Sequence, residues 1–241
     1  MQFELTSGIV KRAQRVLIYG QHGIGKTTLA AQFPGAILID VEDGSGHIDV
    51  MRYPRPTDWQ TLLYEIADAA KRMDAGATLV IDSADWAEKL ATAKVCAEKD
   101  VTSIEGIGYG KGYVYVADEF RRMMRGLDRL IDKGVNVVLV AHEQITTVTM
   151  PGDAMSYSVF GLKLCKQVAS LVKEWADAVL YCHYKQTVTA IDKDGTRGRA
   201  LGGTERVMQC THTTTIDAKN RWGIDGEVSM HIDQITPHIA A

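Results

Sequence analysis

Short, strongly apolar runs alternate with longer stretches in which apolar residues recur every three or four positions. The apolar runs are rich in Val, Ile and Leu, and they lie at 15–20 (RVLIYG), 36–40 (AILID), 77–82 (ATLVID) and 135–142 (VNVVLVAH). Runs of this kind are typical of strands that are buried on both faces of a sheet. The stretches between and after them predict amphipathic helices at about 58–73, 83–100, 113–133 and 163–176.

Thr57 or Asp58 is expected to cap the first of these helices, and Gly134 to end the third. After residue 142 the pattern changes. Gln144 to Leu162 is rich in Thr, Ser, Gly and Met, and it is expected to be a loop. Residues 177–184 (DAVLYCHY) predict a strand that turns back through 192–195 (DKDG) as a hairpin.

Strands joined by helices in this way predict an α/β fold with a mostly parallel central sheet and helices on both faces. A chain of 241 residues is long enough for one such domain. We expect a single domain over 1–241, with an N-terminal arm (1–14), a core (15–184) and an antiparallel, β-rich C-terminal extension (185–241). In folds of this class, ligands collect at the carboxyl ends of the strands.

Charge and composition narrow the function classes. The net charge of −3 gives no general attraction to nucleic acid or to an anionic membrane, so any such binding depends on a local basic surface. The four cysteines are widely scattered, which suits a reducing compartment. No apolar run of about 18 residues occurs, so we expect a cytoplasmic protein without a membrane partner.

The segment GQHGIGKT, residues 20–27, fits the pattern G-x-x-x-x-G-K-[ST] at every fixed position and lies between a strand and a helix start. Its glycines let backbone N–H groups face a chain of phosphates, and Lys26 can reach the β- and γ-phosphates. A glycine-rich turn beside a surface lysine is the alternative. We expect ATP to bind here through Gly20, Gln21, His22, Gly23, Ile24, Gly25, Lys26, Thr27 and Thr28.

A metal site is predicted beside this loop. Asp82 ends the strand TLVID, where its carboxylate can hold Mg²⁺ through water, together with the hydroxyl of Thr27. Alternatively Asp82 caps the following helix, but Ser83 can fill that role equally well. We therefore expect Thr27 and Asp82 to be the metal ligands.

Two more polar residues follow predicted strands at the same edge of the sheet. Glu42 is a candidate to orient or deprotonate the attacking water, and Asp40 and Asp43 compete for this role. His142 ends the strand VVLVA, where its side chain can contact the γ-phosphate or serve as a structural histidine. The residues alone leave these alternatives open.

In their order along the chain, GQHGIGKTT, ILIDVED, TLVIDS and VVLVAH resemble four motifs of the RecA-type core ATPases. These are the Walker A loop, the strand with the catalytic Glu, the Walker B strand and the strand of the γ-phosphate sensor. DVEDGSGHIDV, YGKGY, KEWADAVL and DAKNRWG are similar to segments of small phage-encoded AAA-type ATP-binding proteins, which include the Sak-type single-strand annealing and recombination ATPases.

This resemblance implies a RecA-like P-loop fold, with Glu42 as the general base and His142 as the sensor. KNRWG also resembles a Lys-Asn-Arg-aromatic-Gly motif of the RadA branch-migration ATPases. By that resemblance, Lys219 and Arg221 would reach into the nucleotide site of a neighbouring subunit. The expected catalytic residues are thus Glu42, Lys26, His142, Lys219 and Arg221.

The same resemblance implies two DNA-binding segments, Gly106 to Tyr113 and Gln144 to Lys166. Cations beside aromatic side chains suit single-stranded DNA, and the segments offer Tyr109, Lys111, Tyr113, Tyr157, Phe160, Lys163 and Lys166. The implied partners are single-stranded DNA, further copies of the chain in a ring or filament, and a phage single-strand binding protein.

The expected function is ATP hydrolysis with Mg²⁺, stimulated by single-stranded DNA, in phage-type annealing or strand exchange. Two alternatives remain open. One is a P-loop kinase of a small molecule, with RGRALGGTER (197–206) as its lid. The other is a nucleotide-gated interaction protein with negligible turnover.

Overall fold

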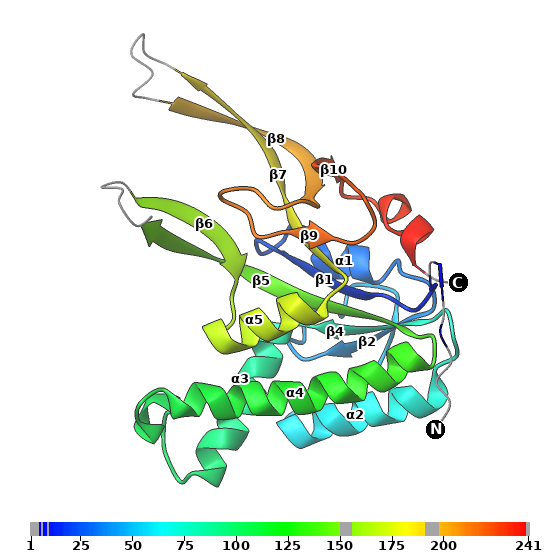
Figure 1. The fold of residues 1–241 in the computed structure, drawn as a ribbon, viewed down its shortest axis with the longest axis vertical. Coiled ribbons are helices and arrows are strands. Elements are labelled where there is room, and N and C mark those ends of the chain that lie inside the picture. The colour runs from blue at the N-terminus through cyan, green and yellow to red at the C-terminus, as the bar shows by residue number, and fades with distance from the viewer. Residues whose placement is uncertain (1–4, 6, 9, 150–155, 191–197, 240–241) are drawn as a thin grey trace.

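The computed structural model describes residues 5, 7–8, 10–149, 156–190 and 198–239. Within them, the chain builds a sheet that is flanked by helices (Figure 1). Its strands are β1 (Arg15–Gly20), β2 (Ala36–Asp40), β3 (Met51–Arg52), β4 (Thr78–Asp82), β5 (Asn136–Thr149), β6 (Ser156–Leu162), β7 (Ala178–Ala190), β8 (Gly198–Gln209), β9 (Lys219–Asn220) and β10 (Glu227–Ser229).

The parallel part of the sheet has the order β3-β2-β4-β5-β1-β7. β8 and then β10 extend it in antiparallel fashion beyond β7, and β9 pairs antiparallel with the start of β7. This arrangement confirms the predicted α/β class, with its mostly parallel sheet and antiparallel C-terminal strands. The boundary expected between residues 184 and 185 falls inside β7, and the proposed domain limits stay predictions.

Helices cover the sheet on both faces (Figure 1). They are α1 (Lys26–Ala30), α2 (Trp59–Arg72), α3 (Ala84–Glu98), α4 (Lys111–Asp132) and α5 (Lys166–Trp175), with 3₁₀ turns η1 (Ile104–Ile107), η2 (Ile232–Gln234) and η3 (Thr236–His238). Buried side chains of α2 to α5 form one core cluster, and those of α1 and the residues around η2 and η3 belong to a second one. None of the helices in the described residues is long and apolar enough to cross a membrane.

α2 shows how local sequence sets these contacts. Asp58 caps it, because its carboxylate accepts the backbone N–H of Thr61 at 2.9 Å. The next residue, Trp59, is buried in the core, and its indole N–H donates to Glu119 of α4 at 2.6 Å. Of the two caps that the sequence offered, the structure selects Asp58.

The loop predicted for Gln144 to Leu162 is wrong in its described part. β5 continues to Thr149 and pairs antiparallel with β6, from Glu143 opposite Leu162 to Thr149 opposite Ser156. The β-branched run ITTVT (145–149) pairs with SYSVF (156–160), which is rich in aromatic residues. Both kinds of residue favour strands, and this preference outweighs the polar composition that predicts a loop. The hairpin of β7 and β8 is confirmed by their pairing, while its predicted turn at 192–195 lies outside the described residues.

The register of the parallel strands brings the predicted site residues to one edge. Gly20 lies beside His142 on one side and Cys182 on the other, and Asp40 lies beside Asp82. A Cβ on Gly20 would lie 2.1 Å from the carbonyl oxygen of Cys182. This glycine is therefore required by the close approach of β1 and β7, before any ligand is considered.

Candidate nucleotide-binding site

The glycine-rich loop joins the end of β1 to the start of α1. Gly23 and Gly25 have φ values of 74° and 102°, which non-glycine residues rarely adopt. The loop wraps around the side chain of Lys26, whose ammonium donates to the carbonyl oxygens of Gly20 and Gln21, both at 2.9 Å. Burial lowers the pKa of Lys26, and the nearby carboxylate of Asp82 partly offsets that effect.

Thr27 and Asp82 come together as the sequence predicted. The Thr27 hydroxyl donates to the Asp82 carboxylate at 2.5 Å, although the two residues belong to α1 and β4. Burial raises the pKa of Asp82 to about 6, against the hydrogen bond from Thr27. A hydroxyl and a carboxylate are oxygen ligands of the kind that Mg²⁺ prefers, so these two residues fit the role of metal ligands.

Among the three acidic candidates at and after the end of β2, Asp40 is hydrogen-bonded by the turn that follows it. Its carboxylate accepts the backbone N–H groups of Asp43, Gly44 and Ser45 and the hydroxyl of Ser45, at 2.5–3.3 Å. Burial alone would raise the pKa of Asp40, but these hydrogen bonds lower it. Asp40 is thus a structural carboxylate that shapes the turn.

Asp43 and Glu42 differ in where they point. Asp43 has an exposed side chain, 3.4 Å from Arg55. Glu42 lines the site, and its carboxylate lies 3.8 Å from Nε2 of His142. Of the three acidic residues, Glu42 is the one whose carboxylate is half-buried at the cavity and does not accept hydrogen bonds from the turn.

His142 is held on its other side by Asp85 of α3. Nδ1 lies 3.0 and 3.1 Å from the two carboxylate oxygens, and the backbone N–H of His142 also donates to this carboxylate at 3.1 Å. Burial would raise the pKa of Asp85, but the bonds from His142 keep it below its usual value. The imidazole also stacks on His22 of the glycine-rich loop, with ring centroids 3.8 Å apart.

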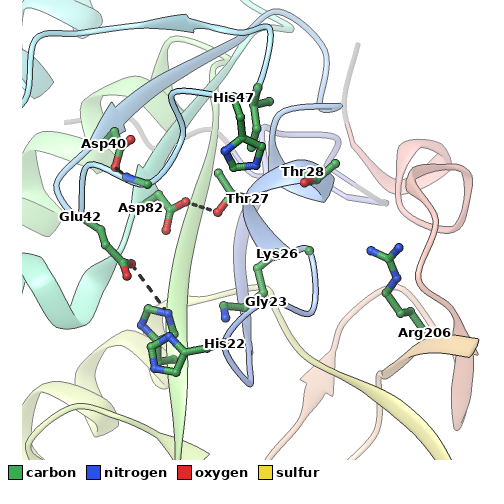
Figure 2. Close-up of a pocket in the computed structure, with 14 residues that line it drawn as sticks. His22, Gly23, Lys26, Thr27, Thr28, Asp40, Glu42, His47, Asp82 and Arg206 are labelled. Atoms are coloured by element: carbon green, nitrogen blue, oxygen red, sulfur yellow. Dashed lines mark hydrogen bonds and ion pairs between the residues drawn. The ribbon is translucent and has the colours of Figure 1, made fainter. Parts of the chain in front are cut away.

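One cavity of about 320 Å³ is lined by His22, Lys26, Thr27, Asp40, Glu42, Asp82 and His142, among others (Figure 2). The cavity wall is formed by the glycine-rich loop, α1, the turn after β2 and the ends of β4 and β8. β5 supplies His142. Of the predicted nucleotide residues, those that line the cavity are His22, Gly23, Gly25, Lys26, Thr27 and Thr28. Gly20 and Gln21 offer carbonyl groups to Lys26, and Ile24 is buried beneath the loop.

Three residues of this region were missed by the sequence analysis: His47, Asp85 and Arg206. His47 lies in the turn after β2, and Arg206 reaches the cavity from β8, 182 positions after Ile24. Spacing along the chain cannot reveal such distant neighbours. Asp85 could have been found from its position, because it is an acidic residue in the first turn of α3 and follows the end of β4 at Asp82 by three residues.

The cavity also holds a second group of potential metal ligands. One ligand atom each of His22, Glu42 and His142 lies within 4.8 Å of the others. The two imidazole rings are stacked, so one ring must turn before both can direct a nitrogen lone pair at one ion. As arranged, the group serves better to fix Glu42 and His142 at the cavity wall.

Lys219 and Arg221 lie away from this cavity. β9 carries Lys219 beside Val179, at the start of β7, whereas the glycine-rich loop lies beyond its Cys182 end. Arg221 pairs with the buried carboxylate of Asp177 at 2.9 Å and keeps a largely exposed side chain. Within one chain the two cations cannot act on the site they were assigned to, so their predicted role requires a neighbouring subunit.

The residues predicted to contact DNA are unequally exposed. Tyr109 is fully exposed, and Lys111, Lys163 and Lys166 are also exposed. Tyr157 is half-buried, and the hydroxyl of Tyr113 donates to Glu105 at 2.8 Å. Phe160 packs on Tyr181, with ring centroids 5.5 Å apart, and so it is poorly placed for base stacking.

A glycine-rich loop between a strand and a helix, a buried lysine and a Thr–Asp pair define a P-loop nucleotide-binding protein. Residues 12–222 match a family model described as an AAA domain. Because the match covers most of the chain, the protein belongs to this family, and membership supports nucleotide binding and ATPase activity in general.

The chain is also similar to a named prophage protein. The chain is 26% identical over 137 residues to the SPbeta prophage-derived uncharacterized protein YorG of Bacillus subtilis (strain 168). The aligned region is 53% of this chain and 40% of that relative, so the chain spans less than half of the relative's length. Together the two comparisons support a phage-associated P-loop ATPase.

Proposed function

We propose that this protein binds ATP with Mg²⁺, hydrolyses it with Glu42 as general base, and acts on single-stranded DNA in phage-type annealing or strand exchange. The observation that carries the proposal is the convergence of Lys26, the Thr27–Asp82 pair, Glu42 and His142 on one cavity. These residues come from α1, β4, β5 and the turn after β2. The parallel register explains why the strand ends share one edge, but it does not require polar or charged side chains there.

In the proposed reaction, Glu42 takes a proton from water as the water oxygen bonds to the γ-phosphorus of ATP. The bond from that phosphorus to the β–γ bridging oxygen breaks, which leaves ADP and inorganic phosphate. Lys26 exchanges its bonds to the loop carbonyls for phosphate oxygens and offsets negative charge. Bound Mg²⁺, held by Thr27 and Asp82, would neutralise further charge on the phosphate oxygens.

His142 offers a route from the nucleotide to DNA. It lies on β5, the strand that continues into the β5–β6 hairpin, and its carbonyl accepts the backbone N–H of Lys163 at 2.9 Å. A shift of His142 on loss of the γ-phosphate would therefore move Lys163 directly. The exposed pair Tyr109 and Lys111 offers a second contact of stacking and charge.

The test is phosphate release with and without single-stranded DNA. We expect turnover that rises with DNA, loss of both binding and turnover in Lys26→Ala, and loss of turnover with retained ATP binding in Glu42→Gln. Dependence on a small-molecule acceptor would favour the kinase alternative. No turnover in either condition, with intact ATP binding, would favour the nucleotide-gated interaction protein.

The DNA surface can be tested separately. We expect a Tyr109→Ala, Lys111→Ala double variant to bind single-stranded DNA more weakly, with unchanged DNA-free turnover. Tyr64→Ala, Lys71→Ala is the matched control, because it removes an exposed tyrosine and lysine from α2. These two residues line a groove of about 550 Å³ whose other cations are Arg122, Arg125 and Arg129. A larger loss of DNA affinity in the control variant would indicate that DNA binds in that groove instead.

A further inference from the structure

Arg206 brings a second cation to the phosphate-binding loop. It lies on β8, in the antiparallel C-terminal part of the sheet, and one terminal nitrogen donates to the carbonyl oxygen of Ile24 at 3.2 Å. The same nitrogen would lie 2.7 Å from a Cβ on Gly25. One edge of the guanidinium thus contacts the loop, at a point where any side chain on Gly25 would displace it, while Arg206 as a whole is exposed.

The charged side chains around the cavity suggest what Arg206 binds. Three carboxylates line it, those of Asp40, Glu42 and Asp82, and its lysine and arginine side chains are those of Lys26 and Arg206. Among the described residues, Arg206 forms no ion pair, and its side chain donates to the neutral carbonyl of Ile24. A planar guanidinium with unused donors is well suited to phosphate oxygens.

The position of Arg206 indicates which phosphates it can reach. In Figure 2 it lies on the opposite side of the loop from Glu42 and His22. The γ-phosphate must face Glu42 for the proposed attack, so the phosphates nearer to the nucleoside extend toward the other side of the loop. Arg206 therefore faces the α- and β-phosphates, and it is remote from the bond that breaks.

We propose that Arg206 is a nucleotide-binding residue, supplied from β8 of the same chain, that holds the α- and β-phosphates of ATP and ADP alike. The inference rests on the proposed nucleotide site. It adds a binding contact that persists after hydrolysis and joins the β7–β8 hairpin to the bound nucleotide. The backbone carbonyl of Arg206 also accepts the N–H of Met230 at 2.9 Å, which links the residues after β10 to the same contact.

The experiment measures ATP, ADP and AMP affinities by calorimetry with Mg²⁺ for the wild type, Arg206→Ala and Arg206→Lys. We expect Arg206→Ala to weaken ATP and ADP by the same factor, about ten- to a hundredfold, and Arg206→Lys to fall between it and the wild type. KM for ATP should rise while kcat at saturation stays within about threefold. Lys185→Ala is the matched control, since it removes a cation from the same hairpin, where Lys185 pairs with Glu205 at 3.7 Å.

The outcomes separate this inference from the function on which it rests. Unchanged affinities in Arg206→Ala, with binding lost in Lys26→Ala, would overturn the Arg206 contact and leave the proposed function standing. A loss for ATP alone would assign Arg206 to the γ-phosphate and overturn the inference as stated. A wild type that binds neither nucleotide would overturn both proposals. A thermal melt of each variant, together with the Lys variant, guards against a loss caused by misfolding.

Discussion

Nδ1 of His142 is hydrogen-bonded to the buried carboxylate of Asp85, at 3.0 and 3.1 Å from its two oxygens. An ionised carboxylate can only accept, so Nδ1 carries the proton and Nε2 is left to face Glu42 at 3.8 Å. A buried acid on α3 thereby fixes both the ring orientation and the tautomer of the residue proposed to sense the γ-phosphate.

Replacing Asp85 by Asn should lower kcat by about ten- to a hundredfold, while ATP affinity changes little. The amide can offer an N–H to Nδ1, which favours the tautomer with the proton on Nε2. That N–H would donate to Glu42 and engage the carboxylate that is proposed to activate the water. Nitrogen-15 spectra of the imidazole should report that change, which a general loss of stability would not produce. Glu88→Gln is the control, because Glu88 is on the same helix but accepts from Cys165. An unaltered kcat in Asp85→Asn would contradict the positioning role.

Asp40 is predicted to matter for stability, and Asp43 is not. Asp40→Ala leaves three backbone N–H groups without their acceptor, so we expect the free energy of unfolding to fall by about 2 kcal/mol. kcat should fall as well, since the same turn carries Glu42. Asp43→Asn should stay within about 0.5 kcal/mol of the wild type, because Asn tolerates the φ of 69° at this exposed position. Chemical denaturation of both variants measures the difference.

The parallel core and the glycine-rich loop were predictable because each depends on local sequence. Apolar runs that end in Gly20, Asp82 or His142 predict strands, and the common direction of these strands brings their ends to one edge. The choice of Glu42 over Asp40 was not predictable from spacing. It depends on which carboxylate accepts the backbone N–H groups of the turn, and here that is Asp40. Such hydrogen bonds leave no pattern in the sequence.

Contacts that join distant parts of the chain account for the remaining misses. Arg206 meets Ile24 only because β8 is added beside β7, and Asp85 meets His142 only because α3 packs against β5. The β5–β6 hairpin was missed for a different reason. Its Ile, Thr, Val and aromatic residues favour strands, whereas its Thr and Ser content is also typical of loops, and pairing between the two strands decides the outcome.

Glu65 on α2 predicts an unusual dependence of stability on pH. It is buried, one carboxylate oxygen has no hydrogen-bond partner among the described residues, and burial raises its pKa to about 7. Between pH 4.5 and 7 the unfolded chain releases this proton while the folded chain retains it, so the free energy of unfolding falls as pH rises.

Glu65→Gln should therefore stabilise the protein at pH 8 by about 1 kcal/mol, after allowance for partial solvent access, and give no gain at pH 4.5. Denaturation curves at the two pH values measure this difference. Glu205→Gln, at an exposed carboxylate of β8, should show no such pH-dependent gain. Equal effects of Glu65→Gln at both pH values would mean that the carboxylate is solvated in solution.

The glycines of the phosphate-binding loop should differ in what they do. Gly20→Ala forces a Cβ to within 2.1 Å of the Cys182 carbonyl, so we expect a loss of about 3 kcal/mol or more in the free energy of unfolding. Gly23 has open space around it but a φ of 74°, so Gly23→Ala should cost about 1 kcal/mol and still fold. Thermal melts compare the two. Similar melting temperatures would show that β1 and β7 can separate at this point without cost.

The proposed action of Lys219 and Arg221 on a neighbouring site can be tested by mixing subunits. Arg221→Ala should fold normally, because Arg12 still pairs with Asp177 at 2.8 Å when Arg221 is removed. On its own it should lose most of its turnover, as should Glu42→Gln, since each variant lacks one half of every shared site. Co-expressed in equal amounts, they should recover about a quarter of wild-type turnover, because random assembly joins an intact Glu42 to an intact neighbouring Arg221 at that fraction of interfaces. Arg221 variants that lose turnover without any recovery on mixing would assign the arginine a role within its own chain, and full turnover of Arg221→Ala alone would remove it from catalysis.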